Sequence, residues 1–173
     1  MEFSFQNKWL AFLLAINAAL LISLIPGGYI ENRDFSHLSA LILVAFNGLL
    51  TALGMSSLLA VPLALKNYQV VAPVSKVLAL VYIIVYALDL LAIFPKTPSV
   101  MPVLLMLVEC IGIVTAILLY AAAIRLARWV DLAEQTPNDF SFKKLSPLCI
   151  LVLALVGNGI VIFSTYSALN SGQ

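Results

Sequence analysis

Charged residues are rare in this sequence. Asp, Glu, Lys and Arg make up only 10% of its 173 residues, and 63% of the residues are hydrophobic. A soluble domain has about a quarter of its residues charged, so this chain cannot cover an aqueous surface. The mean hydropathy of +1.10 instead indicates that lipid covers most of the outside. The net charge of +1 provides no basic surface, and we expect no nucleic acid partner.

Histidine and cysteine are almost as scarce. His37 is the single histidine, which excludes a chain-internal bis-histidine haem or a histidine-rich metal site. Helix counting places Cys110 and Cys149 toward opposite membrane faces, too far apart for the Cα separation of about 5.5 Å that a disulfide needs. We therefore expect no cofactor and no metal, and we predict that the protein is not an enzyme.

Long apolar segments dominate the rest of the chain. Each of five segments is about as long as the 20 residues that span a bilayer: 9–25, 38–65, 73–94, 101–127 and 147–169. The sequence thus predicts an all-α, polytopic transmembrane helical bundle of five spans, forming a single membrane domain over residues 1–173. A cleaved signal peptide would remove the first span and leave four. Small residues are missing from the expected cleavage site, which favours a retained anchor.

Basic residues are distributed unevenly between the two predicted sides. Arg33 and Lys96 lie on one side, and the remaining seven lie on the other: Lys8, Lys66, Lys76, Arg125, Arg128, Lys143 and Lys144. Lys and Arg are enriched in cytoplasmic loops. This bias predicts a multi-pass protein of the plasma (inner) membrane, with a cytoplasmic N-terminus and an outside C-terminus.

Two carboxylates fall inside neighbouring spans, Asp89 in the third and Glu109 in the fourth. Counting outward from a predicted tight turn at 95–98, both lie about 10 Å inside the same end of an antiparallel helix pair. An ionisable group in an apolar span is costly and is by default a functional candidate. Both acids should not be ionised at neutral pH, because burial and mutual repulsion each disfavour the second charge.

Helical spacing predicts that both acids face protein. Glu109 shares a small, polar face with Gly112, and Asp89 shares a flank with Tyr82 and Tyr86. The two tyrosine hydroxyls are available to these acids as donors. We therefore expect the acids to lie in the interior of the bundle.

Arg33, in the polar linker on the same side, is the cation within reach. If its guanidinium folds into the mouth of the bundle, the acids belong to a structural ion pair. If it stays in solvent, the acids remain a proton-responsive or cation-responsive site. The sequence leaves both alternatives open.

Each predicted span carries one hydrogen-bonding side chain at overlapping depth: Asn17, Asn47, Asp89, Glu109 and Asn158. This pattern predicts a shared polar layer. Alternatively, the asparagines simply join neighbouring helices, at about 0.6 kcal/mol for each bond. The candidate polar or proton site contains Asp89, Glu109, Arg33, Asn47, Tyr82, Tyr86 and Asn158.

Two functions from different classes fit these features. The first is a non-enzymatic membrane module, either an accessory subunit or a small-ligand-binding bundle, in which the polar layer fixes packing and the loops contact a partner. The second is a small oligomeric carrier that uses Asp89 and Glu109 as a proton or cation site. The expected partners are the lipid bilayer and either another membrane protein or further copies of the chain.

Overall fold

The protein is an all-α bundle in the computed structural model, which describes residues 2–26, 28–132 and 147–170. The helices of this described part are α1 (Glu2–Ser23), α2 (Ala40–Leu65), α3 (Val71–Leu90), α4 (Val103–Leu132) and α5 (Pro147–Leu169). All five are long and apolar enough to cross a membrane. The predicted transmembrane bundle of five helices is confirmed.

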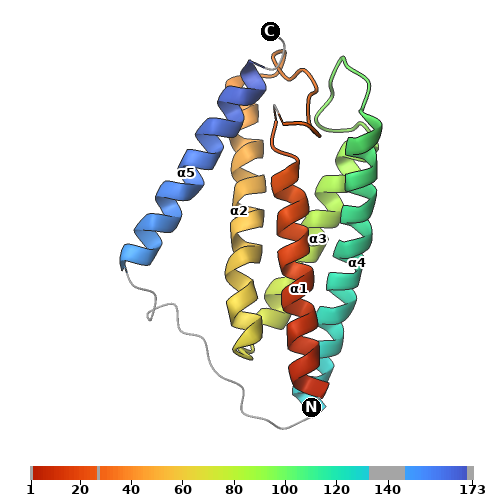
Figure 1. The fold of residues 1–173 in the computed structure, drawn as a ribbon, viewed down its shortest axis with the longest axis vertical. Coiled ribbons are helices and arrows are strands. Elements are labelled where there is room, and N and C mark those ends of the chain that lie inside the picture. The colour runs from red at the N-terminus through yellow and green to blue at the C-terminus, as the bar shows by residue number, and fades with distance from the viewer. Residues whose placement is uncertain (1, 27, 133–146, 171–173) are drawn as a thin grey trace.

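Helices α1 to α4 run alternately up and down and form a four-helix unit (Figure 1). Within it, α1 packs against α2 and α4, and α3 packs against the same two helices. Its core is apolar and includes Leu10, Leu14, Ala79, Tyr82 and Leu119. Helix α5 lies outside this unit, and α2 is its principal neighbour among the described elements.

Helix α3 ends earlier than the sequence predicts, at Leu90. The chain turns there because Ala92 adopts a left-handed conformation with φ of 52°. The Ala92 N–H donates to the Asp89 carbonyl, and the Ile93 N–H donates to the Leu88 carbonyl. These two bonds form a Schellman motif, which satisfies the last carbonyls of a helix. Residues 91–102 are therefore a long connection instead of a tight turn at 95–98, and Asp89 lies in the last helical turn.

The opposite end of the bundle is closed by a second Schellman motif. Asn67, with φ of 59°, follows the last residues of α2, and the Tyr68 N–H donates to the Leu63 carbonyl. The Asn7 amide donates to the side chain of Asn67. Because α1 begins at Glu2 and not at residue 9, its first turns reach this end and hold it.

Candidate functional site: a buried arginine–carboxylate cluster

The described part of the α1–α2 linker, residues 24–26 and 28–39, lies over the end of the bundle where α3 ends and α4 begins (Figure 1). We call this the linker end. The Ser167 hydroxyl of α5 donates to the Pro26 carbonyl at 2.6 Å. His37 Nε2 lies 2.6 Å from the Lys96 carbonyl oxygen in the connection 91–102. The linker is thus held at both of its ends against other parts of the protein.

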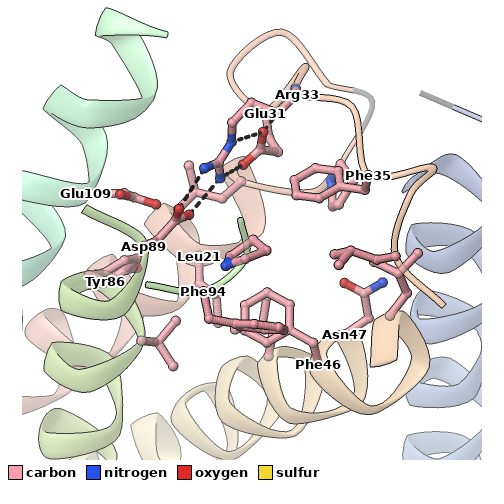
Figure 2. Close-up of a pocket in the computed structure, with 17 residues that line it drawn as sticks. Leu21, Glu31, Arg33, Phe35, Phe46, Asn47, Tyr86, Asp89, Phe94 and Glu109 are labelled. Carbon is pink, nitrogen blue, oxygen red and sulfur yellow. Dashed lines mark hydrogen bonds and ion pairs between the residues drawn. The ribbon is translucent and has the colours of Figure 1, made fainter. Parts of the chain in front are cut away.

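Arg33 points from the linker into the bundle and binds Asp89 (Figure 2). Its Nη1 and Nη2 atoms lie 2.7 Å from the two carboxylate oxygens of Asp89. Its Nε and Nη2 atoms also donate to the carboxylate of Glu31, at 2.9 and 2.5 Å. Only 3% of Arg33 is exposed. The guanidinium fork is therefore shared between two buried carboxylates, a geometry that a lysine cannot reproduce.

The two carboxylates keep the buried guanidinium of Arg33 charged. Burial alone would lower the pKa of Arg33, but its hydrogen bonds with Glu31 and Asp89 and their negative charges outweigh burial and raise that pKa above its ordinary value. Arg33 also lies at the C-terminal end of α3, where a cation is favoured by the helix dipole. The centroid of the Phe35 ring lies 5.5 Å from the guanidinium carbon, so the ring covers the guanidinium from the linker side.

Glu109 of α4 completes the cluster. Its carboxyl group lies beside that of Asp89 (Figure 2), and the residue is 2% exposed. We use the term Arg33 cluster for Glu31, Arg33, Asp89 and Glu109. It contains three carboxyl groups and one guanidinium. A single cation cannot neutralise three buried carboxylates.

A small cavity of about 40 Å³ adjoins the cluster, and Tyr86, Asp89 and Glu109 are among its lining residues. The Glu109 Oε2 atom and the Tyr86 hydroxyl are buried without a hydrogen-bond partner among the described residues. A cavity needs about 10–15 Å³ for one water molecule, and the water needs polar partners. This cavity meets both conditions.

Tyr86 is held in place by close packing between α3 and α4. A Cβ atom at Gly112 would lie 2.5 Å from Tyr86 Cε2, which is shorter than real contacts allow. The rings of Tyr86 and Tyr82 stack with their centroids 6.0 Å apart. Gly112 therefore gives the Tyr86 ring the space it occupies beside Glu109.

The remaining candidate residues do not belong to the cluster. The Tyr82 hydroxyl donates to Ser57 of α2 at 3.0 Å. The Asn47 amide donates to Thr165 of α5 at 3.2 Å, although Asn47 also lines the cavity. Asn158 is exposed, and its amide donates to its own helix. Asn17 accepts a hydrogen bond from Thr115 of α4. The predicted polar layer shared by all five helices is therefore wrong, because Asn17 and Asn158 make contacts away from the acids and only Asn47 lines the same cavity as Asp89 and Glu109.

Glu31 is the member of the cluster that sequence reasoning missed. It lies two residues before Arg33 in the linker, where an acid and a base so close in sequence are usually solvated. The available signal was the pairing of opposite charges in a linker on the same side of the membrane as the acid end of the third span. Only the fold of the linker makes Glu31 a buried partner, at 4% exposure.

A family model, described as a domain of unknown function, DUF8051, matches residues 6–139. The chain belongs to this family. The match includes most or all of each of α1 to α4 and every residue of the Arg33 cluster, and it ends before α5. No curated protein and no solved structure matches the chain. Membership of DUF8051 assigns no activity, and the five long apolar helices identify a multi-span membrane protein.

Proposed function

We propose that the protein is a non-enzymatic membrane module, an accessory bundle whose linker end is fixed by the Arg33 cluster and contacts a partner. The observation that carries this proposal is the position of Arg33. Its guanidinium binds both oxygens of Asp89 while almost fully buried, so it occupies the place that a transported cation would need. A buried ion pair of this kind holds a linker in one conformation.

The small size of the adjoining cavity favours an accessory module over a protein that binds a small molecule at this site. Its volume of about 40 Å³ is far below the 300–1,000 Å³ of pockets that bind drug-sized ligands. Among the described residues, no group of three or more His, Cys, Asp or Glu side chains is arranged to hold a metal ion. The Arg33 cluster therefore serves best as a structural element.

The surface of the linker end suits a partner or the lipid headgroup layer. Tyr29 is fully exposed on the linker, and Val100 is 91% exposed on the connection 91–102. Tyrosine is favoured both at membrane–water interfaces and in protein interfaces. Because the Arg33 cluster fixes the linker, Tyr29 is presented with little loss of conformational entropy on binding.

We also propose the orientation expected from the basic residues. Lys66 closes α2, and Arg125 and Arg128 lie in the last turns of α4, all toward the end opposite the linker. Lys143 and Lys144 are outside the described residues. Under the positive-inside rule this end is cytoplasmic, and the linker end lies outside.

A proton-coupled carrier is the second candidate, and one observation favours it. Glu109 Oε2 and the Tyr86 hydroxyl are both unpaired beside a cavity that can hold water. An acid with a free oxygen, a water site and a neighbouring carboxylate is a minimal set of proton-exchanging groups. In this reading Glu109 carries the proton and Arg33 holds Asp89 in place.

One experiment separates the two candidates. The parent, Glu109→Gln and the control Asp34→Asn, an acid outside the cluster, are reconstituted in vesicles, and proton flux is measured with a pH-sensitive dye inside them. A module gives no flux above empty vesicles for any of the three. A carrier gives flux in the parent and the control that Glu109→Gln abolishes while the variant stays folded. Parent flux of that kind would overturn the module.

A further inference from the structure

The outward face of α5 carries an asparagine midway along a membrane span. Asn158 is exposed, and its amide nitrogen donates to the Ala154 carbonyl of the same helix at 2.8 Å. Among the described residues, its side-chain oxygen receives no hydrogen bond from another helix. Polar side chains in a hydrocarbon environment are costly when they are not paired, and in spans they usually face protein. The position of Asn158 therefore points to a protein neighbour on this face.

Asn158 lies within a regular apolar stripe. Leu151, Leu155 and Ile162 are 56%, 64% and 70% exposed, and with Asn158 they follow the spacing i, i+4, i+7, i+11. Alternating steps of four and three residues form the seam of a coiled coil. A single asparagine in such a seam selects the register and the number of helices that associate. We call residues 151, 155, 158 and 162 the α5 stripe.

A different face of α5 is already occupied. Ser164 and Ala168 are buried there, and a Cβ atom at Gly157 would lie 3.0 Å from Met55 of α2. Thr165, the next position in the spacing of the stripe, is buried and accepts a hydrogen bond from Asn47 of α2, so the open stripe ends at Ile162. Figure 1 shows α5 at the edge of the bundle, with α2 on one side of it. The helix thus has one face that packs within the chain and a second face, the α5 stripe, that remains open.

We propose that α5 is a dimerisation helix, through which two copies of the chain associate side by side along the α5 stripe, with reciprocal hydrogen bonds between their Asn158 side chains. Copies inserted in the same orientation are related by a two-fold axis along the membrane normal. That axis places the two Asn158 residues at the same depth. A carboxamide is both donor and acceptor, so it is complementary to itself.

A second copy of the chain fits the α5 stripe better than an unrelated helix, because the carboxamide of Asn158 is complementary to itself. An unrelated helix must supply its own donor and acceptor at the depth of Asn158, whereas a second copy supplies them by symmetry. This inference goes beyond the proposed function and does not depend on it. The Arg33 cluster contains no residue of α5, and the family match ends at residue 139, before this helix.

The test uses full-length chain in which Cys110 and Cys149 are replaced by alanine. Leu155→Cys is added in the α5 stripe, and Ile111→Cys, 52% exposed on α4, is the matched control. We expect mild oxidation in native membranes to link Leu155→Cys into a covalent dimer and to leave the control monomeric. Labelled, otherwise unmodified chain is also reconstituted in vesicles at increasing ratios of lipid to protein. Single-molecule photobleaching should show two-step traces at the start of this dilution series.

Variants at Asn158 then test the hydrogen bond itself. Asn158→Leu should weaken dimerisation about 3- to 20-fold, the range measured for interhelical hydrogen bonds in membranes, while Asn158→Gln keeps it. Because Asn158 is exposed, both variants should elute as folded, monodisperse protein. One-step traces throughout, equal crosslinking of the control, an unchanged dimer in Asn158→Leu, or crosslinking of the α5 stripe to a different protein would each overturn the proposal.

Discussion

Arg33 and Asp89, one from a polar linker and one from the last turn of a membrane span, meet through two N–O contacts of 2.7 Å. The contact joins residues 56 positions apart in the sequence. It brings a cation to an acid that is buried at the end of α3. The same interaction therefore holds the linker against the bundle and pairs a buried carboxylate of α3.

Removing the guanidinium should destabilise the protein strongly. Arg33→Gln leaves Glu31 and Asp89 buried without a cation, and breaking one partner of a buried ion pair costs about 3–5 kcal/mol. We expect a clear fall in the midpoint of thermal unfolding in detergent. Arg125→Gln, which removes the same side chain at an exposed position, should change the midpoint little. An equally small change of the unfolding midpoint in both variants would show that the cluster is dispensable for stability.

The contributions of Arg33 and Asp34 to stability should be constant over a wide range of pH. The pKa of Arg33 is raised, so its contribution is complete below its ordinary value and is lost only as pH rises through a still higher folded value. Hydrogen bonds from the Ser36 hydroxyl and N–H lower the pKa of Asp34, whose contribution is present above its unfolded value of 3.8 and lost in acid. The difference in unfolding midpoint between the parent and Asp34→Asn should therefore stay constant between about pH 5 and 10.

Arg33→Lys should narrow, on its alkaline side, the pH range in which the side chain at position 33 contributes to stability. A lysine titrates near pH 10.4 in model peptides and cannot bind Asp89 with two parallel bonds. We expect the variant to be less stable than the parent at pH 7, with the difference growing toward pH 10. Midpoints measured at the two pH values test this. A constant difference would mean that the charge at position 33 does not titrate in this interval.

A methyl group at position 112 should disturb the packing around the cluster. Gly112→Ala places its Cβ 2.5 Å from the buried Tyr86 ring, so the ring or α4 must move, at a cost of about 1–3 kcal/mol. The control is Gly48→Ala in α2, where nothing lies within 4 Å of the added Cβ. That substitution should be neutral or stabilising because alanine favours helix. Comparing the unfolding midpoints of the two variants checks the prediction.

A glycine at position 92 should stabilise the protein. Ala92 has φ of 52°, a conformation that costs a non-glycine residue about 1–2 kcal/mol, part of which the larger chain entropy of unfolded glycine offsets. We expect Ala92→Gly to raise the free energy of unfolding by about 0.5–1 kcal/mol. Ala87→Gly, inside α3, should lower it by a similar amount. A fall in both variants would indicate that the Schellman turn does not limit stability.

Part of the site could be predicted from the sequence. Depth along a helix follows from counting residues, so the sequence was sufficient to bring Asp89 and Glu109 to the same end of the bundle. Helical periodicity was sufficient to turn both side chains inward, and both are buried. Asn158 shows where this reasoning fails. Its depth follows from counting, but its direction depends on which face of α5 packs against α2.

The sequence by itself determined that this is a five-helix membrane bundle with two acids at one level, because hydropathy and rise per residue are local properties of each span. Only the tertiary structure decided that Arg33 enters the bundle, that Glu31 accompanies it and that Asn158 faces outward. A linker has no periodicity from which its path can be read. The position of its side chains depends on contacts with distant residues, here Asp89, Lys96 and Ser167.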